Sequence, residues 1–145
     1  LEMATRFGAD VVINYQEDDP VQAILDLTNG RGVDVAIEAL GAQSTFENCL
    51  RVLRPGGTLS SLGVYSGKLT MPLEAFAAGL GDHKIVTTLC PGGKERMRRL
   101  MNVIESQRFD AAQLVTHRFS LGQIEEAYEL FSQQRDGVLK LAITP

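Results

Sequence analysis

The chain has 145 residues, of which 44% are hydrophobic and 22% are charged, and its formal net charge is -4. This composition is ordinary for a soluble globular domain and supplies enough apolar side chains for a core. The negative charge argues against nucleic acid or an anionic membrane as a partner, and no apolar run approaches the length of a membrane span. The two cysteines, Cys49 and Cys90, lack metal-ligand spacing and fit a cytoplasmic protein in a reducing compartment.

The N-terminal segment predicts a helix, a strand and a second helix. Residues 1–7 have a helical pattern without a preceding N-cap residue, so we expect the chain to be a piece of a longer protein. The β-branched run Val11–Tyr15 is too short for a helix and predicts a strand. Asp19 and Pro20 are typical of an N-cap and a first helical position, so a helix is expected to begin there.

The middle of the chain predicts a strand, a helix, a turn and another strand. Val33–Ile37 is an apolar strand, and Ser44 with Glu47 forms a capping-box pattern at the start of the helix. Pro55-Gly56-Gly57 then breaks the helix and turns into a strand over Thr58–Val64.

The C-terminal part predicts two clear helices. An amphipathic helix over Gly93–Gln107 carries an apolar stripe, with Met97 and Met101, that we expect in the core. Ser120 and Gln123 form a second capping-box pattern at the start of the other helix. The remaining expected elements are a short helix near Leu73–Ala78 and strands over Lys84–Leu89, Leu114–His117 and Val138–Ile143.

This alternation of strands and helices predicts an α/β fold with a parallel sheet covered by helices on both faces. We expect a single domain over residues 1–145. Ligands of such sheets bind outside the carboxyl ends of the strands, and two strands end there in glycine-bearing loops, at Leu40-Gly41 and Leu62-Gly63. No G-x-G-x-x-G loop is present, so the sheet can touch a dinucleotide but lacks the usual loop that holds its phosphates.

Several stretches in a fixed order carry a resemblance that covers essentially the whole chain. They are residues 7–14, 30–41, 53–57, 62–64, 90–93, 114–121 and 124–128. With this order and spacing the chain resembles the coenzyme-binding domain of medium-chain, zinc-dependent alcohol dehydrogenases, and its Leu89–Gly93 turn is most similar to bacterial secondary alcohol dehydrogenases. The resemblance implies a partial Rossmann-like sheet that lacks the first two strands and the Gly-rich loop. It also implies NAD or NADP as the cofactor, and hydride transfer between an alcohol and a ketone or aldehyde at a catalytic zinc.

The resemblance assigns positions around the cofactor. The two glycine-bearing loops would border its ribose groups and the nicotinamide, the end of the next strand would close the nicotinamide end, and a lysine would lie near the pyrophosphate. These cofactor-binding positions are Ala39, Leu40, Gly41, Leu62, Gly63, Val64, Thr88, Leu89 and Lys140. Cys90 would line the substrate pocket.

No catalytic residue and no metal ligand is expected in this chain. The resemblance implies that the zinc ligands belong to an N-terminal domain that the chain lacks. His83 and His117 are each isolated from other ligand types, whereas zinc needs three or four ligands.

Each candidate also has a simpler interpretation. Gly41 and Gly63 fit ordinary turn glycines, Lys140 fits an exposed strand lysine, and Cys90 fits a small buried hydrophobe. The resemblance favours the cofactor role for the two glycines and leaves both interpretations of Lys140 open.

Without its first two strands the sheet would have an exposed central edge, which invites pairing with another strand. We therefore expect either a rearranged sheet, with Val11–Tyr15 beside Val33–Ile37, or completion by another chain. In the family the strand that matches Lys84–Leu89 pairs across a subunit two-fold, so a homodimer through that edge is the predicted assembly.

Three functions remain open on the sequence. The first is the C-terminal coenzyme-domain portion of an NAD(P)-dependent alcohol dehydrogenase, which acts on a small alcohol or carbonyl substrate in the full-length protein and is inactive alone. The second is a non-catalytic folded fragment or oligomerisation module. The third is the nucleotide domain of a zinc-free reductase. The sequence leaves the choice between NAD and NADP open.

Overall fold

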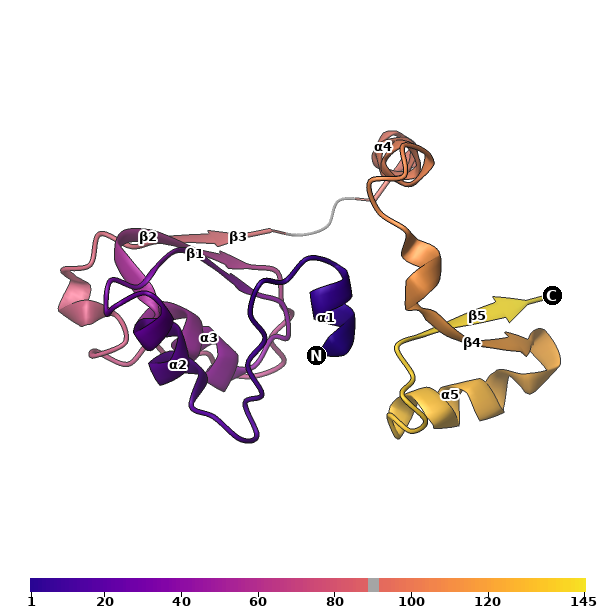
Figure 1. The fold of residues 1–145 in the computed structure, drawn as a ribbon, viewed down its shortest axis with the longest axis horizontal. Coiled ribbons are helices and arrows are strands. Elements are labelled where there is room, and N and C mark those ends of the chain that lie inside the picture. The colour runs from indigo at the N-terminus through magenta and orange to yellow at the C-terminus, as the bar shows by residue number, and fades with distance from the viewer. Residues whose placement is uncertain (89–91) are drawn as a thin grey trace. The chain divides into compact units, whose positions relative to one another are not determined.

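The structure is a computed structural model of the 145-residue chain, and it describes residues 1–88 and 92–145. The chain divides into two compact units, Leu1–Cys90 and Pro91–Pro145, each with a parallel sheet of its own (Figure 1). The single domain predicted over residues 1–145 stays a prediction. No helix among the described residues is long and apolar enough to cross a membrane.

The first unit is built on three parallel strands in the order β1-β2-β3. These strands are β1 (Val33–Glu38), β2 (Leu53–Ser61) and β3 (Lys84–Thr87). The connection from β1 to β2 is α3 (Gln43–Arg51), which packs against both strands. Parallel strands joined by a crossover helix form the βαβ unit, so the α/β class is confirmed.

The core of the first unit lies between α3 and one face of the sheet. Phe46 and Leu50 are four residues apart, which places them on one face of α3, and both are buried together with Leu59 of β2. On the sheet's other face, Val35 and Ile37 are exposed. Two helices of this unit, α3 and α2 (Pro20–Leu27), contact each other on the same side of the sheet (Figure 1). Its remaining elements are α1 (Glu2–Arg6) and η1 (Ala77–Gly79).

The predicted start of α2 is confirmed. Asp19 is the N-cap, Pro20 is the first helical residue, and the Asp19 carboxylate accepts a hydrogen bond from the main-chain N–H of Val21 at 2.9 Å. This bond satisfies one of the N–H groups that a helix start leaves without an intrahelical partner.

Removing this cap is expected to lower the free energy of unfolding. Asp19→Ala leaves the N–H of Val21 without its side-chain acceptor, which costs about 1 kcal/mol. Urea denaturation followed by circular dichroism measures the change, and Asp18→Ala, one residue outside the cap, is the matched control. Equal midpoints for the two variants would contradict the capping role.

The predicted strand Val11–Tyr15 is wrong. Residues 11–14 have no regular secondary structure, and the side chains of Val11 and Tyr15 are exposed. A strand satisfies its main-chain groups only beside another strand, and no described strand pairs with this segment. The rearranged sheet with Val11–Tyr15 beside Val33–Ile37 is therefore wrong as well.

The predicted capping box at Ser44 is also wrong. The helix begins two residues earlier than this capping box requires, at Gln43, with Ala42 as its N-cap and without a side-chain cap. Glu47 has other partners, because its carboxylate accepts from Gln43 Nε2 at 2.6 Å and pairs with Arg51 at 2.8 Å. The short helix expected near Leu73–Ala78 is replaced by turns that lead into η1.

The second unit pairs β4 (Val115–Ser120) in parallel with β5 (Lys140–Thr144). They are connected through η3 (Leu121–Gln123) and α5 (Ile124–Ser132), and α5 packs against both strands. The predicted capping box between Ser120 and Gln123 is confirmed.

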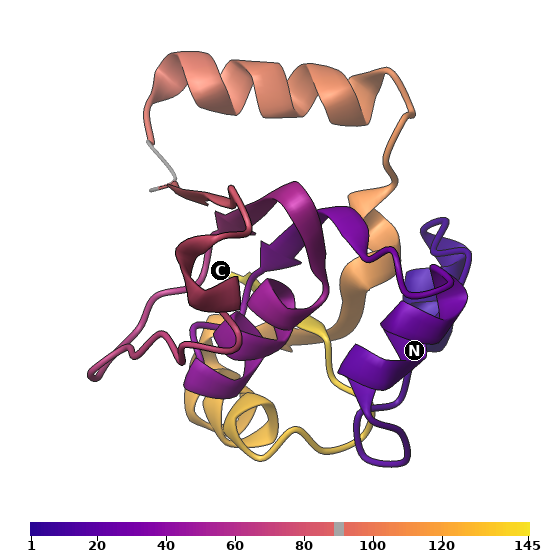
Figure 2. The ribbon, with the colours of Figure 1, turned by 90° about the vertical axis from the view of Figure 1, so that its left-hand side faces the viewer.

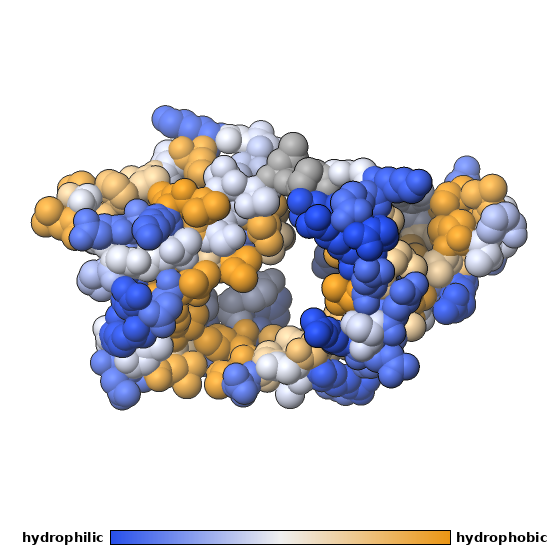
Figure 3. All heavy atoms as spheres, turned by 90° about the horizontal axis from the view of Figure 1, so that it is seen from above, coloured by the Kyte–Doolittle hydropathy of each residue, from blue (hydrophilic) through white to orange (hydrophobic). Residues whose placement is uncertain are grey.

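The longest described helix, α4 (Lys94–Glu105), is drawn in orange in Figure 2 and is followed by η2 (Ala111–Leu114). Met97 and Met101 on α4 are exposed, so the core position expected for their stripe is wrong for the described residues. The periodicity of the helix was predicted, but periodicity alone does not supply a surface for the stripe to pack on. Apolar side chains also reach the surface in several other places (Figure 3).

Candidate functional site

The candidate site is formed by two loops at the carboxyl ends of β1 and β2. We call residues 39–42 the β1 loop and residues 62–65 the β2 loop. Because the strands are parallel, both loops lie at the same end of the sheet. The main-chain oxygen of Glu38 accepts from the N–H of Leu62 at 2.7 Å and from that of Gly63 at 3.3 Å, which joins the second loop to the end of β1.

The structure brings most of the predicted cofactor positions to this end of the sheet. The N–H of Thr88, just after β3, donates to the carbonyl of Ser61 at 3.2 Å and so lies beside the end of β2. The positions gathered there are Ala39, Leu40, Gly41, Leu62, Gly63, Val64 and Thr88. Two predicted positions, Leu89 and Cys90, lie outside the described residues.

The two loop glycines are required by the close approach of the loops. A Cβ on Gly41 would overlap the main-chain carbonyl of Val64, and Gly41 also has a φ of +87°, which L side chains rarely adopt. A Cβ on Gly63 would overlap both the carboxylate of Glu38 and the main chain of Gly41. Each loop therefore fills the space in which the other would carry a side chain. This packing explains both glycines without a ligand, and their contact with a cofactor stays a prediction.

Glu38 lies at the centre of the two loops and is 1% exposed. Its carboxylate accepts four hydrogen bonds, three at Oε1 and one at Oε2. The donors are the N–H of Leu40 at 2.9 Å, the N–H of Gly41 at 2.8 Å, the Thr45 hydroxyl at 2.7 Å and the Tyr65 hydroxyl at 2.8 Å. The single side chain thus connects the β1 loop, the first turn of α3 and the β2 loop.

These donors keep Glu38 ionised. Burial raises the pKa of a carboxyl group, but hydrogen bonds from Thr45, Gly41, Tyr65 and Leu40 outweigh it and lower the pKa of Glu38 to about 2. The neighbouring groups stay neutral instead, because burial raises the pKa of the Tyr65 hydroxyl. Burial, together with the charge of Glu38, also raises the pKa of the half-buried Cys49 thiol, so this thiol is a poor nucleophile.

Glu38, Thr45 and Tyr65 were not among the candidate residues predicted from the sequence. The sequence contains one usable signal for Glu38. It is an acidic residue at the end of an apolar strand, with a glycine three positions later, and such a side chain can accept hydrogen bonds from the N–H groups of the turn that follows. Tyr65 carried none, because it is 27 residues from Glu38 in sequence.

The rim of the site is apolar. The side chains of Leu40, Leu62 and Val64 are 72%, 49% and 85% exposed, although large apolar side chains are usually buried. Beside them lies a cavity of about 340 Å³ whose lining residues are Gly41, Ala42, Gln43, Tyr65, Ser66, Gly67, Lys68 and Leu69. Small-molecule sites are typically apolar clefts with a few polar groups, and this cavity has a mixed lining of apolar and polar residues.

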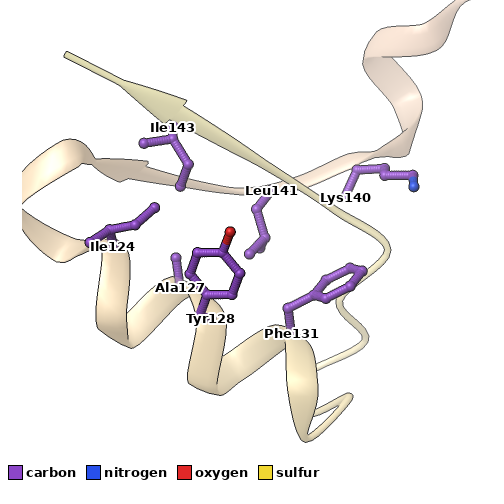
Figure 4. A pocket seen from close by; sticks show the side chains of 7 residues that line it. All are labelled: Ile124, Ala127, Tyr128, Phe131, Lys140, Leu141 and Ile143. Carbon is purple, nitrogen blue, oxygen red and sulfur yellow. The ribbon is translucent and has the colours of Figure 1, made fainter.

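Lys140, the remaining predicted position, is the first residue of β5 in the second unit. It lies at the edge of an apolar pocket of about 260 Å³ between α5 and β5, and its ammonium group points away from the other labelled side chains (Figure 4). The structure does not place Lys140 relative to the two loops, so its role at the pyrophosphate stays a prediction.

The described residues contain no group of three or more His, Cys, Asp or Glu side chains placed to hold a metal ion. Because zinc takes three or four such ligands, this part of the chain does not by itself fit a zinc site.

Comparison with known proteins identifies the family of the chain. The profile of a family described as zinc-binding dehydrogenase matches residues 1–106. The chain belongs to this family. An alcohol dehydrogenase of Cupriavidus necator is 68% identical to it over 145 residues, which are all of this chain and 40% of that protein. The NADP-dependent isopropanol dehydrogenase of Thermoanaerobacter brockii is 33% identical over 144 residues, 97% of this chain and 41% of its own length.

Solved structures show the same relationship. The zinc dependent alcohol dehydrogenase 2 from Streptococcus pneumonia matches 99% of this chain and 41% of its own, with a TM-score of 0.86 and 35% identity. The predicted relationship to medium-chain, zinc-dependent alcohol dehydrogenases and the partial Rossmann-like fold are confirmed. The chain spans about two fifths of the length of the relatives that it matches.

Proposed function

We propose that the chain is the C-terminal part of the coenzyme-binding region of an NAD(P)-dependent alcohol dehydrogenase. In the full-length protein it would bind the cofactor for hydride transfer between a small alcohol and the corresponding carbonyl compound. Secondary alcohols are the favoured substrate class. The observation that carries the proposal is the pair of interlocked loops after β1 and β2, with their exposed apolar rim. Similarity to isopropanol dehydrogenases supports the substrate class, because isopropanol is a secondary alcohol.

The chain's own residues would form one wall of the cofactor site. Leu40, Leu62 and Val64 would cover the apolar faces of the cofactor and exclude water from them. Lys140 would provide a positive charge for the pyrophosphate. The bound nicotinamide supplies the hydride acceptor or donor. The described residues lack a zinc ligand set, so we expect no turnover by this chain alone.

The predicted cytoplasmic location and the homodimer belong to the same proposal. β3 forms an edge of the three-stranded sheet, and its four residues are exposed, which supports pairing of the Lys84–Leu89 edge with a second copy.

The chain is expected to bind reduced cofactor weakly at the two loops. Because it has no Gly-rich phosphate loop, we expect a Kd on the order of 0.1 mM for NADH or NADPH, about -5.5 kcal/mol. Titration of the ¹⁵N-labelled chain followed by NMR measures this Kd and locates the site. The amides of Leu40, Gly41, Gly63 and Val64 are expected to shift, whereas the amide of Ala23 in α2 serves as the internal control.

A well-dispersed spectrum in which neither cofactor moves the loop amides would contradict the cofactor role. It would favour the alternative of a non-catalytic folded fragment. Shifts with only one of the two cofactors would identify the preferred one.

A further inference from the structure

We propose that Glu38 is a positioning residue of the cofactor site. Its buried carboxylate holds the β1 and β2 loops in the relative position that cofactor binding requires. This inference rests on the proposed function, because it concerns the same two loops. Glu38 itself is 1% exposed, so it acts through the loops and not by contact with the cofactor.

Glu38 accepts hydrogen bonds from both loops, from one through its main-chain oxygen and from the other through its carboxylate. Its main-chain oxygen accepts from Leu62 and Gly63 of the β2 loop. Its carboxylate accepts from Leu40 and Gly41 of the β1 loop. The loops also touch directly where Gly63 packs against Gly41. A shift of the Glu38 side chain would therefore change the spacing between the exposed side chains of the rim.

A carboxylate suits this place because every partner is a donor. Oε1 receives two main-chain N–H groups and the Thr45 hydroxyl, and Oε2 receives the Tyr65 hydroxyl. None of these four donors carries a charge, so the negative charge is held by hydrogen bonds alone. An apolar side chain of similar length would leave the part-buried N–H groups of Leu40 and Gly41 without this acceptor, and a desolvated donor without a partner is destabilising.

Glutamine is expected to preserve most of this arrangement. Its Oε1 can accept the same three hydrogen bonds, and its Nε2 can donate to the Tyr65 oxygen. Tyr65 can then turn its own hydrogen toward Ser61 Oγ, which lies 2.8 Å away in a pair where either atom can donate. Glu38→Gln and Glu38→Met therefore separate the geometry of the hydrogen bonds from the mere presence of a long side chain.

Thr45 provides a second, milder test of the same contact. Its hydroxyl donates to Glu38 Oε1 at 2.7 Å and connects the carboxylate to the first turn of α3. Thr45→Val keeps the shape of the side chain and removes the donor, whereas Thr45→Ser keeps the donor. Recovery of cofactor binding in the serine variant would assign the effect to the hydroxyl.

The experiment compares these variants in two measurements on the ¹⁵N-labelled chain. The Kd for NADH is expected to rise at least about tenfold in Glu38→Met and about threefold in Thr45→Val. In the matched variants the Kd is expected to stay close to that of the parent chain, within about threefold for Glu38→Gln and within about twofold for Thr45→Ser. Hydrogen exchange of the Leu40 and Gly41 amides is expected to accelerate at least about tenfold in Glu38→Met.

The control for general destabilisation is Val52→Ala. Val52 is buried just before β2, at the amino end of the strands and so opposite to the loops, and its truncation lowers stability without touching the site. The Kd for NADH is expected to stay within about twofold of the parent value in this variant. If Glu38→Met does not fold, the Thr45 pair decides the question against the same control.

The outcomes separate the inference from the function on which it rests. A parent chain that binds NADH, with Glu38→Met and Thr45→Val binding equally well, overturns the positioning role alone. An equal loss of binding in Val52→Ala also overturns it, because the effect would then follow stability. A folded parent chain that binds neither NADH nor NADPH overturns the proposed function and the inference with it.

Discussion

Alanine at Gly41 or Gly63 is expected to lower the free energy of unfolding of the first unit by about 3 kcal/mol or more. In both variants the new Cβ would overlap main-chain atoms, those of Val64 for Gly41→Ala and those of Gly41 for Gly63→Ala, which no side-chain rotation can move away. Gly41→Ala also places an L residue at a φ of +87°, and this backbone strain costs roughly 1–2 kcal/mol. Gly63→Ala would in addition push the buried carboxylate of Glu38 away from its donors.

Gly67→Ala is the matched control for these variants. Gly67 lies in the same segment after β2, but an added Cβ would meet nothing within 4 Å, and its φ is outside the left-handed range. Its stability is therefore expected to change by less than about 1 kcal/mol, with a gain possible because alanine restricts the unfolded chain. Urea denaturation followed by circular dichroism compares the three variants. If Gly41→Ala or Gly63→Ala proved as stable as Gly67→Ala, the loops would not be interlocked as the structure has them.

Much of the local structure followed from short-range signals. The apolar run at Val33–Ile37 and the N-cap pair Asp19-Pro20 are both present as predicted, because their partners lie within a few residues or within one sheet. The general rule that ligands bind at the carboxyl ends of parallel strands also identified the loops at Gly41 and Gly63. This rule needs only strand direction, which the alternation of strands and helices already indicated.

Two of the errors share a physical cause, which is a dependence on distant partners. Val11–Tyr15 has the β-branched residues of a strand, but strand formation needs a neighbouring strand that this segment does not find among the described residues. The apolar stripe of α4 likewise has the right period and remains exposed. Sequence periodicity shows which face of an element is apolar, but it does not show what covers that face.

Glu38 illustrates the same limit within the site. Its donors in the β1 loop are two and three residues away and belong to a recognisable turn. Its contact with Tyr65 spans 27 residues, and its burial depends on the packing of α3 over the sheet. The reason for the two loop glycines was hidden in the same way, since the atoms that exclude a side chain belong to the opposite loop.

Acid is expected to destabilise the first unit through Glu38. The pKa of this carboxyl group is about 2 in the folded chain, against an ordinary value of 4.5 when it is exposed. Because the folded pKa is the lower one, the folded state binds this proton more weakly than the unfolded state does. The resulting stabilisation is fully present above pH 4.5 and is lost as the pH falls toward 2. The shift corresponds to about 3 kcal/mol.

Glu38→Gln isolates this contribution, because glutamine has no proton to bind in this range. The free energy of unfolding of the parent chain is expected to fall by about 3 kcal/mol more than that of Glu38→Gln between pH 5 and pH 2. Other carboxylates such as Glu47 and Glu95, whose pKa values are also lowered by hydrogen bonds, titrate in both proteins and cancel in the comparison. Urea denaturation at several pH values gives both curves. Parallel curves would mean that Glu38 is equally easy to protonate in the folded and unfolded chain. In that case its four hydrogen bonds would not form in solution, and the two loops would lose the contact that sets their spacing.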